Sequence, residues 1–148
     1  MKIIVQNKVA YHNYFIIESY EAGIQLQGSE IKSVRSGKVN INDAYVTIKD
    51  GEIFIVNMHI SKYEQSSIFN HVETRKRKLL LHSSQIRKLK QAKEKQGYTI
   101  IPLKMYFVVG LAKLEIALVK GKQLHDKRDD LKEKEDIKKI KQAMKRSV

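Results

Sequence analysis

The sequence predicts a mainly β fold with flanking helices: an OB-like antiparallel β-barrel over residues 1–120, followed by a basic C-terminal tail over residues 121–148. Short apolar segments alternate with polar residues at the period of strands, two segments show helical spacing, and the composition changes sharply after residue 120. Six or so strands joined by short turns favour a closed or nearly closed barrel, because closure removes unpaired strand edges.

The clearest strand signal lies in residues 44–49, where apolar and polar side chains alternate. Asp50-Gly51 follows and predicts a type I′ hairpin turn, since both central residues of that turn need positive φ; residues 52–58 would form the returning strand. The other predicted strands are residues 13–19, 23–27, 98–108 and 111–119, with a turn at Glu21-Ala22-Gly23 and another near Gly110.

Two helices interrupt the strands. The first is predicted from Ser29, a good N-cap residue, to about Ser36, with Gly37 as its stop. The second begins at Ser83 or Ser84 and ends before Gly97.

Residues 121–148 differ in kind from the barrel. They contain no aromatic residue and no proline, and their apolar positions are scattered among Lys, Glu, Gln and Ala. Such a segment buries too little apolar surface to offset the entropy of ordering it. We expect this tail to be disordered in isolation and helical on a surface.

The net charge of +13 is concentrated in two blocks. Residues 71–95 hold nine Lys/Arg against two Asp/Glu, and residues 120–148 hold eleven against six, whereas residues 1–70 are neutral. Such blocks attract a polyanion, and the release of its counterions favours binding. A merely soluble basic surface is the alternative. An anionic membrane is disfavoured, because neither block carries an aromatic-rich apolar face.

The residue types present argue against several kinds of chemistry. The chain has no cysteine, and its five histidines show no metal-ligand spacing, so we expect no metal site. Nucleophile-elbow, phosphate-loop and dinucleotide motifs are absent, so we expect no cofactor and no enzyme activity. The start of the sequence lacks a signal peptide and no stretch is long enough to span a bilayer, which favours a cytoplasmic protein.

The most distinctive basic feature is Arg75-Lys76-Arg77-Lys78 followed by Leu79-Leu80-Leu81-His82. Four cations entering a short apolar run would place phosphate contacts at the mouth of a strand, with the leucines fixing the strand's orientation. The alternative is a solvated charge run before a helix.

Five segments taken in order resemble the SmpB family across essentially the whole chain. They are NKVAYHNYFI from Asn7, YEAGIQLQGSEIKSVRSGKVNINDAYV from Tyr20, RKRKLLLH from Arg75, GYTIIPLKMYF from Gly97 and ALVKGKQLHDKR from Ala117. The family often has prolines where this chain has Lys62 and Glu73.

The resemblance implies an RNA-binding protein of trans-translation. Members bind the tRNA-like domain of tmRNA and help deliver it, aminoacylated and with elongation factor Tu, to stalled ribosomes, while their tail occupies the empty message channel near the decoding centre. Glu21, Leu80 and Lys113 match family positions tied to tmRNA binding. Candidate RNA contacts in matching motifs are Asn7, His12, Arg75, Arg77 and Lys78; the tail motif needed on the ribosome matches His125, Asp126, Lys127 and Arg128.

Alternative interpretations stay open for these residues and for the class. Glu21 could serve only to order a turn, and Leu80 could serve only in packing; Lys113, on a strand, is the simplest candidate for a phosphate contact. Two other classes fit the composition: a different OB-like RNA-binding module, which would use aromatic stacking, and an RNA-processing enzyme.

Overall fold

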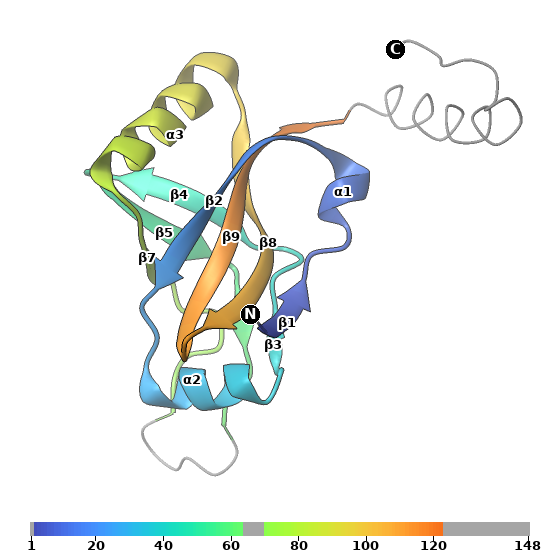
Figure 1. Ribbon diagram of the computed structural model, residues 1–148, viewed down its shortest axis with the longest axis vertical. Coiled ribbons are helices and arrows are strands. Elements are labelled where there is room, and N and C mark those ends of the chain that lie inside the picture. The colour runs from blue at the N-terminus through green and yellow to red at the C-terminus, as the bar shows by residue number, and fades with distance from the viewer. Residues whose placement is uncertain (1, 64–69, 123–148) are drawn as a thin grey trace, which may run out of the picture.

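One curled antiparallel sheet forms the body of the protein (Figure 1). The structure is a computed structural model that describes residues 2–63 and 70–122. The main sheet has seven strands in the order β1-β8-β9-β2-β7-β5-β4, and β3 pairs with β6 in a separate small sheet. The strands are β1 (Lys2–Gln6), β2 (Tyr14–Ile24), β3 (Val39–Asn40), β4 (Tyr45–Lys49), β5 (Glu52–Val56), β6 (His59–Ile60), β7 (Arg77–Leu80), β8 (Thr99–Val108) and β9 (Leu111–Gly121); the helices are α1 (Ala10–Asn13), α2 (Gly28–Arg35) and α3 (Ser83–Gln96).

The sheet curls until β4, at one end of the strand order, packs against β8 near the other end. Apolar residues from the inner face of nearly every strand fill the enclosed space. Leu114, Ile116 and Leu118 of β9, which the alternation in the sequence assigns to one inward face, are all buried. The predicted mainly β class with flanking helices is therefore confirmed.

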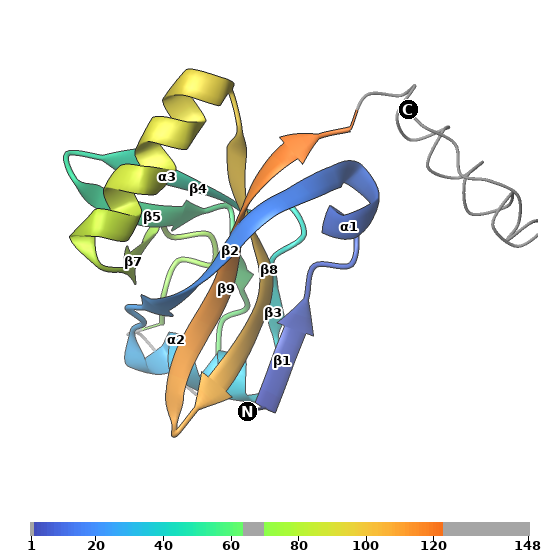
Figure 2. The same cartoon turned by 45° about the horizontal axis from the view of Figure 1, so that its top comes forward.

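Two helices cover opposite ends of the curled sheet (Figures 1 and 2). α3 buries Ile86 and Leu89 in the core and ends at Gly97, which has a positive φ of 67°. α2 lies near the end of the β8–β9 hairpin. It begins at Gly28 with Gln27 as its N-cap, two residues before the predicted N-cap Ser29, because Gln27 and Glu30 form a reciprocal capping box.

Two hairpins turn through two residues of positive φ. Asp50 and Gly51 have φ values of 54° and 77° and join β4 to β5, as the sequence predicts. Val109 and Gly110 have φ values of 48° and 79° and join β8 to β9.

The turn predicted at Glu21-Ala22-Gly23 is wrong. β2 runs without a break through these residues and pairs with β9, with Glu21 opposite Glu115 and Gly23 opposite Lys113. The glycine is explained by close packing and not by a turn, because a Cβ on Gly23 would lie 3.3 Å from Cβ of Leu80 on the adjacent strand. β1, α1 and the two-residue strands β3 and β6 were not predicted from the sequence.

The boundary proposed near residue 120 falls at the end of β9, which closes at Gly121. The expectations of disorder in the tail and of roles for His125, Asp126, Lys127 and Arg128 lie outside the described residues. In the part of the chain that is described, no helix has the length and apolar character needed to cross a membrane.

Candidate nucleic-acid interface

Four strands contribute one residue each to a row across the sheet. Leu80 of β7 pairs with Gly23 of β2, Gly23 pairs with Lys113 of β9, and Lys113 pairs with Tyr106 of β8. Glu21 stands two residues from Gly23, and its side chain therefore lies on the same face as the row. The fold thus assembles Glu21, Leu80 and Lys113, which are distant in the sequence, on one surface, which we call the row surface.

Gly23 leaves the middle of the row surface without a side chain, and a hollow opens on each side of Leu80. One hollow, of about 280 Å³, lies between the row and α2. The other, of about 410 Å³, is bordered by Glu21, Leu80 and Lys113 together with the start of α3. Leu80 is 48% exposed, so it forms an apolar ridge between the two hollows rather than a packed core residue.

The carboxylate of Glu21 is held in place by Tyr106. The Tyr106 hydroxyl donates a hydrogen bond of 2.8 Å to Oε2 of Glu21. Burial of the Tyr106 ring, the hydrogen bond to Glu21 and the negative charges of Glu21 and Glu115 raise the pKa of Tyr106, so the hydroxyl stays protonated and remains a donor.

The row surface combines two kinds of hydrogen-bonding group that suit RNA. A carboxylate accepts from base N–H groups and from ribose 2′-hydroxyls but repels phosphate, whereas the ammonium of Lys113 binds phosphate. The Leu80 ridge between them offers an apolar surface to a base. Such a mixture distinguishes RNA features better than a uniformly basic patch, which binds any polyanion.

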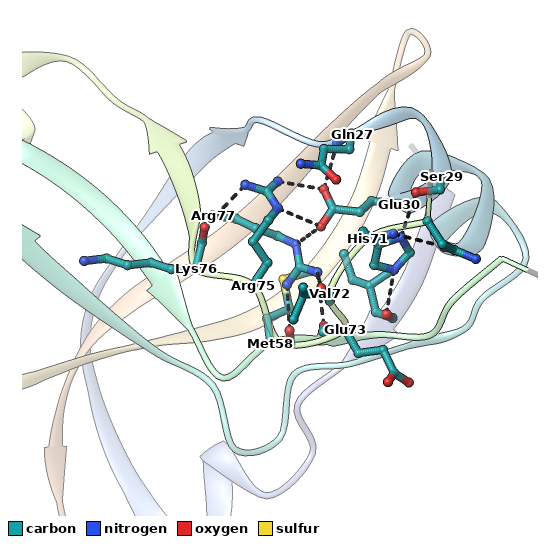
Figure 3. A network of polar contacts seen from close by, with 12 residues as sticks. Gln27, Ser29, Glu30, Met58, His71, Val72, Glu73, Arg75, Lys76 and Arg77 are labelled. Atoms are coloured by element: carbon teal, nitrogen blue, oxygen red, sulfur yellow. Dashed lines mark hydrogen bonds and ion pairs between the residues drawn. The ribbon is translucent and has the colours of Figure 1, made fainter. Parts of the chain in front are cut away.

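Alternate residues of the basic run Arg75-Lys76-Arg77-Lys78 have different environments, so the run divides into two pairs. Arg75 and Arg77 both reach the carboxylate of Glu30 in α2, which has no exposed side-chain area (Figure 3). Arg75 Nη2 lies 2.7 Å from Oε1 of Glu30, and Arg77 Nε donates to Oε2 at 2.5 Å. Arg77 also donates to the Met58 carbonyl at 2.7 Å.

Hydrogen bonds offset the cost of burying the Glu30 carboxylate beside Arg75 and Arg77. Burial alone would raise the pKa of Glu30, but the hydrogen bonds from Arg75, from the Gln27 backbone and from Arg77 outweigh burial and hold that pKa below its ordinary value. Burial lowers the pKa of Arg77, against the opposing effect of Glu30. The group joins α2 to β7 and to the segment before it.

This burial corrects the assignment of Arg77 as an RNA contact. Its side chain has no exposed area, so in this structure it anchors β7 and cannot meet phosphate. Arg75 keeps 31% of its side chain exposed while bound to Glu30. Lys78 faces the other side, where it is 38% exposed and forms an ion pair with Glu52 at 2.5 Å. Four adjacent cations in sequence therefore do not form one phosphate-binding cluster.

Asn7 and His12 lie away from the row surface. Asn7 is 3% exposed, and its Nδ2 donates to the Pro102 carbonyl at 3.0 Å, so its assignment as an RNA contact is replaced by a structural role. His12 is exposed on α1, beside the start of β2. Seven residues along β2 separate Tyr14, near His12, from Glu21 on the row surface, a distance of about 23 Å at about 3.3 Å per residue.

Three residues that shape the candidate site are not identified by the sequence. The sequence indicates a turn at Gly23, Tyr106 lies 85 positions from Glu21, and Glu30 lies 47 positions from Arg77. Their roles arise from strand pairing between distant segments, which no local pattern reveals. Among residues 2–63 and 70–122 no cluster of three His, Asp or Glu side chains could hold a metal ion.

The fold and this surface define a class: a small antiparallel barrel that carries a mixed apolar and polar face suited to RNA. The family model described as SmpB protein matches residues 4–146. The chain belongs to the SmpB family.

Individual relatives agree with the family match. The SsrA-binding protein of Acholeplasma laidlawii is 58% identical over 142 residues, which cover 96% of this chain and 95% of that protein. The SsrA-binding protein of Bacillus cereus is 54% identical, covering 96% and 92% of the two chains. A chain of the solved structure described as "tmRNA-SmpB: a journey to the center of the bacterial ribosome" is 41% identical, with a TM-score of 0.70, over 86% of this chain and 93% of that one.

Proposed function

We propose that this protein binds the tRNA-like domain of tmRNA through the row surface and helps deliver tmRNA to stalled ribosomes. The observation that carries the proposal is the convergence of Glu21, Leu80 and Lys113 from three different strands. The description of the similar solved structure, which names tmRNA together with SmpB and the ribosome, supports this ligand. Elongation factor Tu meets the protein indirectly, through aminoacylated tmRNA.

The roles of the three residues follow from their surroundings. Lys113 contacts phosphate, the Glu21 carboxylate accepts from a base or a 2′-hydroxyl, and Leu80 presents its exposed side chain to an unstacked base. Arg75 and Lys78 contribute at the margin, because each is partly exposed but already paired with a carboxylate.

Binding to an isolated transcript of the tRNA-like domain tests this function. The full chain should bind this transcript more tightly than an unstructured RNA of equal length. Lys113→Ala should weaken binding and lower the slope of log Kd against log salt by about one, the loss of one phosphate contact. Lys49→Ala, which removes an exposed lysine from the β4–β5 hairpin, is the matched control and should leave both quantities unchanged. Equal affinity for the two RNAs would favour a general single-strand RNA-binding module instead.

On the ribosome, we infer that the C-terminal residues enter the empty message channel, with His125, Asp126, Lys127 and Arg128 at its entrance near the decoding centre. The protein is then cytoplasmic and acts as an adaptor, not as an enzyme. Incubating labelled tmRNA with the purified chain separates the adaptor from a processing enzyme: the RNA should be recovered uncut and unmodified, and cleaved or modified RNA would contradict the proposal.

A further inference from the structure

The turn between β8 and β9 holds a valine in a backbone conformation that valine rarely adopts. Val109 has a φ of 48°, in the left-handed region, where a side chain crowds the following carbonyl and a β-branched one does so most. The side chain is 96% exposed, so the conformation is not compensated by packing into the core.

The β4–β5 turn provides an internal comparison. Asp50 occupies the equivalent position in the β4–β5 turn, with a φ of 54°. Asp and Asn tolerate this conformation and favour such turns. The same chain therefore has a well-suited residue in one turn and an unsuited, apolar one in the other. Unfavourable backbone conformations of this kind concentrate at functional sites.

The Val109 turn adjoins the smaller hollow of the row surface. Gly110 and Leu111 line that hollow together with Leu80. Leu111 is 63% exposed and Leu80 is 48% exposed, so two apolar side chains that border this hollow are open to solvent. Exposed apolar side chains around a hollow are typical of a binding site.

Two cations stand at the same hollow. Lys113 comes from β9, and Arg35 comes from the last turn of α2, where its guanidinium lies 6.0 Å from the centre of the Phe107 ring. An apolar recess with cations beside it matches the chemistry of one nucleotide unit, whose base has apolar faces and whose two neighbouring phosphates are anionic.

We propose that Val109, Leu111 and the hollow beside Leu80 form a site for an unpaired nucleobase of the bound RNA, with Arg35 and Lys113 facing the adjoining phosphates. The inference rests on the proposed function and adds to it the kind of RNA feature that is recognised: a base that is free of pairing and stacking. Val109 supplies apolar contact area in spite of its backbone conformation.

Val109→Asn tests the site, because its expected effects on folding and on binding are opposite. Asparagine suits the left-handed conformation, so the variant should raise Tm by about 2–4 °C. The polar side chain should also weaken binding of the tRNA-like domain transcript by about fivefold or more, as expected for a lost base contact. The salt slope should stay the same, since no phosphate contact is removed. Val109→Leu keeps the apolar surface and should bind as the unaltered chain does.

Abasic substitutions at the unpaired positions of the transcript identify the base. At one position, the abasic substitution should weaken binding to the unaltered chain but have little further effect on binding to the Val109→Asn variant. That result would show that both changes remove the same contact. A variant that is more stable and binds the transcript as tightly as the unaltered chain would overturn the nucleobase site while leaving the proposed function intact. If the unaltered chain failed to prefer the transcript, the proposed function itself would fail.

Discussion

The Tyr106 hydroxyl of β8 donates a hydrogen bond of 2.8 Å to the Glu21 carboxylate of β2, which lies beyond the intervening strand β9. The two residues are 85 positions apart in the sequence. One carboxylate oxygen is thereby engaged within the protein. Because Tyr106 is 4% exposed, its ring is fixed by packing and it fixes the direction of the carboxylate in turn. An acidic group held in this way can accept from RNA without losing side-chain freedom on binding.

Tyr106→Phe removes this hydrogen bond and keeps the ring. We expect affinity for the tRNA-like domain to fall about fivefold, on the scale of one hydrogen bond, with an unchanged salt slope. In a Glu21→Ala background, which has no acceptor for the hydroxyl, the same substitution should have a much smaller effect, as a double-mutant cycle would show. Tyr98→Phe, at the residue just before β8, serves as the control for loss of a hydroxyl. Additive effects of the Tyr106 and Glu21 substitutions would contradict the coupling.

Glu30→Gln should destabilise the fold by about 3 kcal/mol, because it leaves the Arg77 guanidinium buried without its counter-charge. The pKa of Glu30 lies below its ordinary value of 4.5 in the folded protein, so its contribution to stability is present above pH 4.5 and is lost as pH falls further. The free energy of unfolding, measured against pH, should therefore decline more steeply below pH 4.5 in the unaltered chain than in the variant. Parallel pH profiles would show that the ion pairs do not act in this way.

Gly23→Ala tests whether the hollowed centre of the row surface matters. The added Cβ would lie 3.3 Å from Cβ of Leu80, so the Leu80 ridge must shift by a few tenths of an ångström. We expect stability to change by less than about 1 kcal/mol while RNA affinity falls several-fold, since the Leu80 side chain can move but its position on the surface changes. Chemical denaturation and RNA binding measured on the same samples separate these effects. Unaltered binding would indicate that the RNA does not enter the centre of the row.

Replacing Asp126, Lys127 and Arg128 together with alanine should separate RNA binding from action on the ribosome. Affinity for the tRNA-like domain should persist, because the row surface lies within residues 2–122. Addition of the peptide tag on ribosomes stalled at truncated messages should be lost. Messages that extend further beyond the P site should compete with the tail and suppress tagging by the unaltered chain. Normal tagging by the triple variant would exclude this role for the tail.

Local patterns in the sequence predicted the elements whose causes are local. Alternation at residues 44–49 and the Asp50-Gly51 pair are sufficient to specify a hairpin, and Gly97 is sufficient to end α3. Features that depend on pairing between distant strands could not be predicted in this way. Gly23 indicated a turn in the sequence because glycine is common in turns, whereas the fold uses it for close approach to Leu80.

The burial of the Arg77 charge was the other feature that could not be predicted from the sequence. Arg77 looked like its three neighbours in a run of cations, and its interior position follows from the placement of Glu30 on a helix 47 residues earlier. The family resemblance identified Glu21, Leu80 and Lys113 as a set, and the structure explains their association by placing them on one face.

Chemical-shift mapping tests the central claim, that the tRNA-like domain binds the row surface. Spectra of the isotopically labelled full chain would be recorded with increasing amounts of the transcript. We predict that the largest changes occur at the amides of Glu21, Gly23 and Lys113 and at the methyl groups of Leu80, and that Asp50 on the opposite hairpin is unaffected. Changes concentrated on α3 or around His12, with the row surface unperturbed, would contradict the account.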